Sequence, residues 1–152
     1  MATRSTIGYR TPEGRIIAVY CHWDGYPSNN GRILSESYTD IAKIAELISG
    51  GSISSLQAEV GETHSFSRMD TAMSAEDWET AYGKMTTFYA RDRGEELQIR
   101  IYNDAREFVA AGEEYNYLFN GIEWLVNDHG EVDDIGWPVF DLLSTVLETE
   151  AA

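Results

Sequence analysis

The sequence predicts a single α+β domain, in which a mostly antiparallel sheet of five to six strands carries about three helices packed on it. Two turn signals indicate the sheet, because alternating apolar runs flank both Asn120-Gly121 and the segment Thr11–Gly14. A third observation indicates a helix between strands, since apolar residues recur at helical spacing from Leu34 to Ile48. Strands and helices that alternate irregularly favour α+β over a doubly wound parallel sheet.

The N-terminal part of the chain predicts a hairpin of two strands, 5–10 and 15–23, joined by Thr11-Pro12-Glu13-Gly14. Alternate residues of a strand share a face. We therefore expect the second strand to present one set to the core and one set outward: Ile17, Val19, Cys21 and Trp23 inward, and Ala18, Tyr20, His22 and Asp24 outward. Asp24-Gly25-Tyr26-Pro27 ends this strand, because proline cannot donate to a ladder.

One helix is predicted from the N-cap candidates 28–30 to Ile48, with Gly50-Gly51 as its stop. Segment 52–83 has no steady period and predicts an ordered loop region with a short helix from Ser74 to Tyr82. Such a region is either functional or a variable surface insertion.

The C-terminal half predicts two more strands, a short helix, a hairpin and a last helix. We expect strand 85–90, a charged turn at 91–94, and strand 97–102 with Leu97, Ile99 and Ile101 buried. A helix is predicted over 105–111 after the cap Asp104, followed by the hairpin 115–127. The last helix is expected to begin at Pro138, with Asp133 and Asp134 before it.

Charge is the strongest global signal, because 26 acidic and 11 basic side chains give a formal net charge of −15. A field of this sign disfavours nucleic-acid binding and favours a partner with a basic surface, although excess acid also simply keeps a protein soluble. The candidate acidic contact surface consists of Glu76, Asp77, Glu79, Glu95, Glu96, Asp133 and Asp134.

Composition also limits cofactors and location. A single cysteine with three scattered histidines predicts neither a disulfide nor a structural zinc site, and no cofactor is expected. No apolar run approaches the ~20 residues of a membrane helix, and the start has no signal-peptide pattern, so we expect a cytoplasmic protein. A sheet with a free face or edge commonly pairs with a copy of itself, which predicts a homodimer.

Two groups of residues are candidates for binding. His22 and Asp24 share the outward row with Tyr20 and Tyr26, and a carboxylate beside an imidazole suits acid–base chemistry. The alternative, which we favour, is that Asp24 starts an Asp-Gly turn and His22 bonds locally.

The second group is Arg91 and Arg93, which together with Arg4 form either an anion site or a surface ion-pair cluster with neighbouring acids; we favour the cluster. No glycine-rich phosphate-binding motif supports a nucleotide site. Catalysis by Cys21 is not expected, because its predicted position is buried.

Several segments carry a resemblance over nearly the whole chain: ATRSTIG, VYCHWDGYP, NNGRIL, SISSL, HSF, FYARDRGEE and EEYNYLFNGIEWLV. In this order they resemble a family of small bacteriophage and prophage proteins. The resemblance implies expression in the cytoplasm of an infected bacterium, and it carries over no catalytic residue.

Three functional hypotheses follow. The one we favour is a non-enzymatic accessory protein that binds and inhibits a host defence protein, of the anti-CRISPR or anti-restriction type, through its acidic surface. The alternative is a small anionic-ligand or nucleotide-binding protein or hydrolase that uses the His22/Asp24 turn with Arg91 and Arg93. A further alternative is a virion accessory protein.

Overall fold

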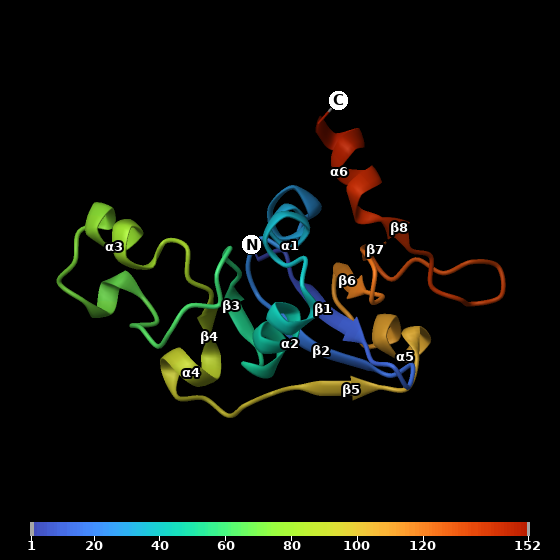
Figure 1. Cartoon of the computed structure of the whole chain (residues 1–152), viewed down its shortest axis with the longest axis horizontal. Coiled ribbons are helices and arrows are strands. Elements are labelled where there is room, and N and C mark those ends of the chain that lie inside the picture. The colour runs from blue at the N-terminus through green and yellow to red at the C-terminus, as the bar shows by residue number, and fades with distance from the viewer. Residues whose placement is uncertain (1, 152) are drawn as a thin grey trace.

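The computed structural model describes residues 2–151, and within them eight strands form one mixed sheet (Figure 1). The order is β4-β3-β2-β1-β6-β7-β8, and β5 pairs with β2 beside this path. The strands are β1 (Ser5–Arg10), β2 (Ile16–Cys21), β3 (Ile53–Ser55), β4 (Thr87–Phe88), β5 (Arg100–Tyr102), β6 (Tyr115–Phe119), β7 (Trp124–Asp128) and β8 (Asp141–Leu142). The α+β class is confirmed, but the predicted strand number was too low.

Both predicted hairpins are present as antiparallel pairs, β1 with β2 and β6 with β7. Phe119 pairs with Trp124, so four residues connect β6 and β7. The Asn120 side chain orders this connection by accepting from the backbone N–H groups of Ile122 and Glu123, both at 2.9 Å. The pairs β1–β6 and β2–β3 are parallel, which makes the sheet mixed.

Six α-helices are found in the described range, twice the predicted number. They are α1 (Arg32–Ser37), α2 (Ile41–Ser49), α3 (Ala75–Tyr82), α4 (Tyr89–Arg93), α5 (Ala105–Ala110) and α6 (Leu143–Ala151), and the π-helical turn η1 (Pro27–Gly31) precedes α1. Ser74 and Asp104 cap α3 and α5 as predicted, each side chain accepting from a backbone N–H three residues on. None of these helices has the length and apolar composition needed to cross a bilayer.

The single helix predicted up to Ile48 is wrong, because the chain leaves the helical conformation at Tyr38 and restarts after Asp40. The freed carbonyl of Tyr38 accepts a hydrogen bond from Trp124 Nε1 at 2.8 Å, and Asp40 caps α2 by accepting from the Ala42 N–H. A residue far away in the sequence therefore satisfies the carbonyl that the helix break leaves free. Local periodicity could not reveal such a partner.

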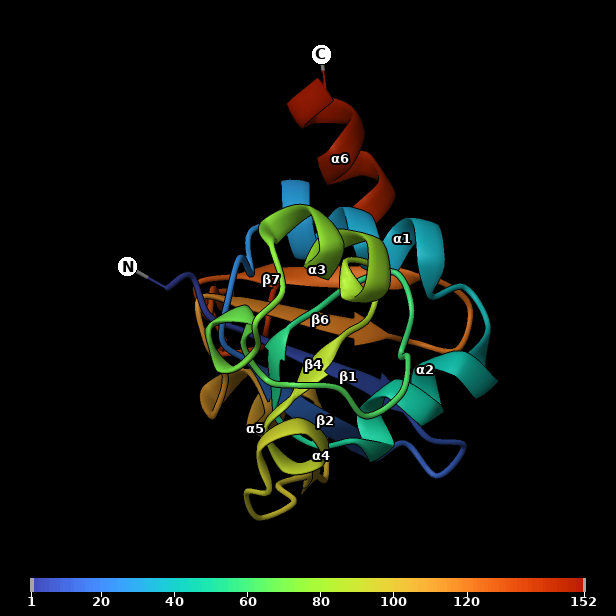
Figure 2. The ribbon, with the colours of Figure 1, turned by 90° about the vertical axis from the view of Figure 1, so that its left-hand side faces the viewer.

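Helices cover the two faces of the sheet unequally (Figure 2). The larger core packs one face against α1, α2 and α6, and includes Ile7, Val19 and Cys21. On the other face, α5 covers only part of the sheet, over Ala18 and its neighbours. Ala18 was expected to face outward and is instead buried.

The strand β2 ends at Cys21, two residues earlier than predicted. The alternation therefore does not continue, and Trp23, which was expected in the core, is exposed. Its backbone N–H pairs with the Ser54 carbonyl at 3.1 Å, so the main chain remains tied to β3 while the indole lies outside.

Three predictions for the C-terminal half are also wrong. Segment 91–94 is the end of α4 rather than a turn, closed by Gly94 at φ +72°. Leu97, Ile99 and Ile101 are exposed instead of buried. The last helix begins only at Leu143, since Pro138 lies in an extended bridge opposite Val132.

Candidate functional site

Tyr20 and His22 form the best-defined polar pair of the outward row. The Tyr20 hydroxyl lies 2.6 Å from His22 Nδ1, and the imidazole packs edge-on against Trp23 with ring centroids 4.6 Å apart. Burial raises the pKa of Tyr20 above its ordinary value, so the phenol stays neutral and can donate this bond. His22 is therefore oriented by a phenol, and not by the carboxylate that acid–base chemistry would use.

Asp24 and Tyr26 lie in the turn that leads from β2 into η1, and both are exposed. Asp24 has a left-handed backbone with φ +54°, and its carbonyl accepts from the Asn30 N–H and Asn29 Nδ2, both at 3.2 Å. Within residues 2–151, no hydrogen bond joins the Asp24 carboxylate to His22. The geometry gives Asp24 a conformational role in this turn.

Asn30 holds the turn against the sheet. Its side chain is fully buried, and Nδ2 lies 3.2 Å from Ser5 Oγ, 3.4 Å from Cys21 Sγ and 3.3 Å from the Trp23 carbonyl. Burial raises the pKa of the Cys21 thiol to about 11, so this cysteine is protonated at neutral pH. The thiol is a packing group next to the turn.

Arg91 is an internal clamp. Its guanidinium donates to the carbonyls of Val60 and Thr86 at 2.9 and 2.7 Å and to the Asp92 carboxylate, while it stacks on Phe88. All of these partners are groups of the protein itself. The guanidinium is therefore used in fastening the 57–83 region to β4.

Arg93 pairs with Glu95 and lies over the rings of Phe66 and Tyr89, 4.4 and 5.0 Å from their centroids. In the described chain, neither Arg91 nor Arg93 forms a hydrogen bond or ion pair with His22 or Asp24. The structure thus brings Tyr20 together with His22 and places the two arginines in separate interactions.

A hollow opens beside α5, on the sheet face that this helix partly covers. Its volume is about 180 Å³, and its lining consists of Thr6, Ala18, Val19, Tyr20, Ser52, Arg100, Tyr102, Ala111 and Glu113. Ala18 contributes only a methyl group to this lining, and Gly8 lies opposite it in the β1–β2 ladder. A shallower hollow shares Tyr20 and Ser52 and extends to Tyr89, Glu95, Glu96 and Gln98.

Sequence reasoning did not single out Arg100 and Tyr102. Both lie on the predicted outward face of strand 97–102. Their register opposite Ala18 and Ile16 puts them on the same sheet face as Tyr20, and all three line the hollow. Their alternation with Leu97, Ile99 and Ile101 was the signal that could have shown that Arg100 and Tyr102 share one face of a strand. The pairing of β5 with β2 could not be read from it.

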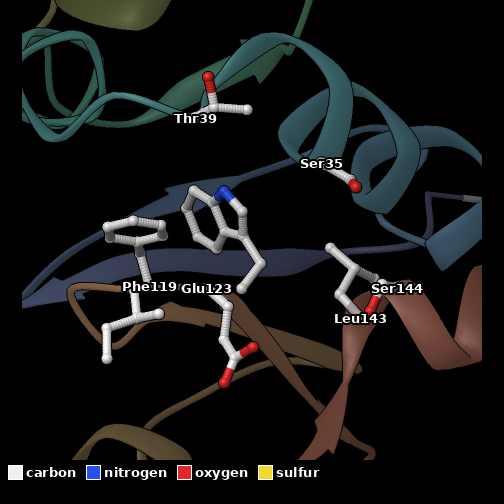
Figure 3. A pocket seen from close by; sticks show the side chains of 8 residues that line it. Ser35, Thr39, Phe119, Glu123, Leu143 and Ser144 are labelled. Carbon is white, nitrogen blue, oxygen red and sulfur yellow. The ribbon is translucent and has the colours of Figure 1, made fainter.

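Another hollow lies between α1, the β6–β7 connection and the start of α6 (Figure 3). Phe119 and Trp124 form its floor, with ring centroids 5.4 Å apart, and the indole N–H is already bound to the Tyr38 carbonyl. Glu123 contributes a single carboxylate, and Ser35 and Ser144 contribute hydroxyls. Within residues 2–151 no hydrogen bond joins the Glu123 carboxylate to either serine, so we interpret the hollow as the outer surface of the core.

The predicted acidic residues are all exposed, but they form separate groups. Glu76, Asp77 and Glu79 lie on α3 at one end of the long axis, and the loop with Asp133 and Asp134 lies at the opposite end (Figure 1). Glu95 is paired with Arg93, and Glu96 is its neighbour at the rim of the shallower hollow. The acidic residues therefore do not form one continuous surface.

The charge is strongly segregated along the chain. Eleven acidic side chains and no lysine or arginine follow Arg106. Glu107 lies on α5, and the other ten lie on β6, β7, β8, α6 and the connections next to them, so most of the net charge belongs to one side of the sheet.

Across residues 2–151, no three His, Cys, Asp or Glu side chains converge as ligands for a metal ion. No protein-family model, curated protein or solved structure matches the chain.

Proposed function

We propose that this chain is a non-enzymatic, phage-encoded accessory protein that binds and inhibits a host defence protein through an acidic surface. The observation that carries the proposal is the charge segregation after Arg106, which gives the side of the sheet formed by β6, β7, β8 and α6 a negative field. Complementary potentials steer association and select partners, so a basic groove that normally holds nucleic acid is the surface this field fits best.

The site geometry supports contact rather than catalysis. His22 is bonded to a phenol, Cys21 is buried and protonated, and Arg91 is engaged with backbone carbonyls. None of these groups has the partner that a nucleophile or general base requires. A binding protein needs no such partner.

The test is capture of host proteins from bacterial lysate by the immobilised full chain, at low and at high salt. We expect a captured defence protein whose binding weakens steeply with salt, because electrostatic association is screened. The double variant Glu131→Lys, Asp134→Lys should lose it. Glu13→Lys with Glu46→Lys changes the net charge equally at other exposed positions and should retain it.

The purified captured protein must then lose activity when the chain is added. Binding that is insensitive to salt, or that both double variants weaken equally, would contradict an acidic contact surface on this side of the sheet.

A second candidate function is binding of a small anionic ligand in the hollow at Tyr20. The observation in its favour is Arg100, which lines the hollow and makes no ion pair within the described chain. Tyr20 and Tyr102 offer aromatic surface beside it, which suits a nucleotide.

The probe for this candidate is adenosine monophosphate, titrated into labelled protein and followed by amide chemical shifts. Shifts are expected at Thr6, Tyr20 and Ala111. Arg100→Gln should raise the dissociation constant for adenosine monophosphate about tenfold. Arg15→Gln is the matched control, since Arg15 is an exposed arginine beside the β1–β2 turn. Equal titration curves for the two variants would exclude the hollow as the site.

A further inference from the structure

The connection between β7 and β8 carries an exposed apolar patch. Val132, Ile135 and Trp137 are 52%, 74% and 45% exposed, and all three lie within six residues of one loop. The loop projects from the β8 end of the sheet (Figure 1). Large apolar side chains gathered on a projecting segment are typical of contact sites, whereas single exposed ones are not.

A groove runs beside this patch, between the loop and α5. Its volume is about 490 Å³, and its lining includes Arg106, Val109, Ala110, Val132, Gly136 and Pro138. Most of these side chains are apolar or absent. Ile135 and Trp137 flank Gly136 in the chain, so they stand next to the groove lining.

The loop is held in one conformation. Val132 and Pro138 form a bridge, and the Asp133 N–H donates to the Trp137 carbonyl at 2.8 Å. From the buried side, Asn127 Nδ2 donates to the carbonyls of Glu131 and Val139 at 3.0 and 2.9 Å. A preformed surface binds without the entropic cost of ordering a loop.

The charges around the groove select its occupant. Glu131, Asp133 and Asp134 lie on the loop, and the one basic side chain of the lining, Arg106, has its guanidinium over the Trp137 ring at 4.8 Å. A second copy of this chain would bring another net charge of −15 to this surface. A basic partner is attracted instead.

We propose that the groove between α5 and the 130–138 loop docks a basic, extended segment of a partner protein. An apolar side chain of that segment enters the groove and packs on Val132 and Ile135, while flanking lysine or arginine side chains approach Asp133 and Asp134. This inference deepens the proposed function, on which its choice of a basic partner rests.

The test uses a random dodecapeptide library selected on the immobilised full chain at low salt. Enriched peptides are expected to contain an apolar residue flanked by lysine or arginine. A labelled enriched peptide is then titrated by fluorescence anisotropy. Ile135→Ser should weaken its binding about tenfold or more, because a hot-spot aliphatic side chain is lost.

Ile122→Ser is the matched control, since Ile122 is 84% exposed in the connection at the other end of β7 and loses the same atoms. This control should bind as the wild type does. Ala110→Gln, which places a longer side chain over the groove from an exposed position of α5, should also weaken binding, and Ala81→Gln at an exposed position of α3 should not. The two alanine substitutions are at exposed positions and leave the core intact.

Enrichment of peptides without basic residues, no enrichment, or equal binding by the Ile135 and Ile122 variants would overturn the inference. Its failure is distinguishable from failure of the proposed function. Salt-sensitive capture of a host protein that Ile135→Ser leaves unchanged would retain an acidic contact surface and remove only the groove.

Discussion

The guanidinium of Arg91 binds the carboxylate of its chain neighbour Asp92 side-on, with Nε 2.9 Å from Oδ1 and Nη2 3.1 Å from Oδ2. The Asp92 side chain is fully buried, and its carboxylate also accepts from the backbone N–H groups of His64 and Phe88 at 3.2 and 2.8 Å. This ion pair therefore ties the 57–83 region, β4 and α4 together.

Asp92→Asn is expected to lower the free energy of unfolding by about 3 kcal/mol, because it leaves a partly buried guanidinium without its counter-charge. The new amide also turns a donor toward backbone N–H groups that need an acceptor. Urea unfolding followed by circular dichroism measures the loss.

The control for this variant is Glu95→Gln, which breaks the exposed pair with Arg93. It should cost less than about 1 kcal/mol, since exposed ion pairs contribute little. Equal losses for the two variants would show that the buried carboxylate does not fasten this region.

Stability is expected to fall in alkali. Burial raises the pKa of Cys21 to about 11 and that of Tyr38 to about 12, and it also raises the pKa of Tyr117. Each group favours its neutral form in the native state. The resulting stabilisation is fully present below the unfolded-state pKa, which is 9.0 for cysteine and 10.0 for tyrosine. It is lost as the pH rises through the higher pKa of the folded state.

Cys21 alone contributes at most roughly 3 kcal/mol to this effect. The urea midpoint should therefore decline as the pH is raised from 8 to 11. For Cys21→Ala the midpoint should be lower at pH 8 and should decline less steeply with pH than that of the wild type. A stability that is constant up to pH 11 would be incompatible with these buried groups.

Turns and caps made much of the fold predictable from sequence. Ser74 and Asp104 are N-cap residues that act within one helical turn, and Asn120 organises its connection through its own side chain. These signals are local, so no distant part of the chain can change them. They explain why both hairpins and the two capped helices were predicted.

The failures have long-range causes. The helix break at Tyr38 depends on Trp124, 86 residues away. The exposure of Ile99 and Ile101 depends on where β5 joins the sheet, which is beside β2. Alternation shows that two faces differ, but only the packing shows which face another element covers.

The candidate site was partly predictable for the same reason. Tyr20 and His22 share a row in the sequence pattern, and they are bonded in the structure. Arg100 reaches the hollow beside Tyr20 only through the β2–β5 pairing. The exposed Ile135 was missed because Pro138 indicated a helix, although Asp133 three residues before Gly136 is also typical of a turn.

Asp133→Ala is expected to loosen the 130–138 loop. Asp133 Oδ1 accepts from the Ile135 and Trp137 N–H groups at 3.0 and 2.9 Å, and loss of these bonds should cost about 1 kcal/mol locally. Hydrogen exchange at those two amides should accelerate severalfold. The neighbouring change Asp134→Ala should leave their exchange unchanged, and equal acceleration would show that the side chain of Asp133 does not order the loop.

Asp24 offers a way to separate conformation from contact in the turn after β2. Its φ of +54° is tolerated by aspartate, favoured by glycine and strained for a β-branched residue. The free energy of unfolding of Asp24→Gly should therefore lie within about 0.5 kcal/mol of the wild-type value, because relief of strain offsets the greater entropy of the unfolded chain. Asp24→Val should lose about 1–2 kcal/mol more.

Urea unfolding of both variants checks the conformational part, and a valine variant as stable as the glycine variant would contradict it. The glycine variant then tests contact, because it removes the exposed carboxylate and keeps the turn. If Asp24 only shapes the turn, Asp24→Gly captures the same host proteins as the wild type. If the carboxylate also meets a basic partner, capture falls while stability does not, since the charge is lost and the backbone is unchanged.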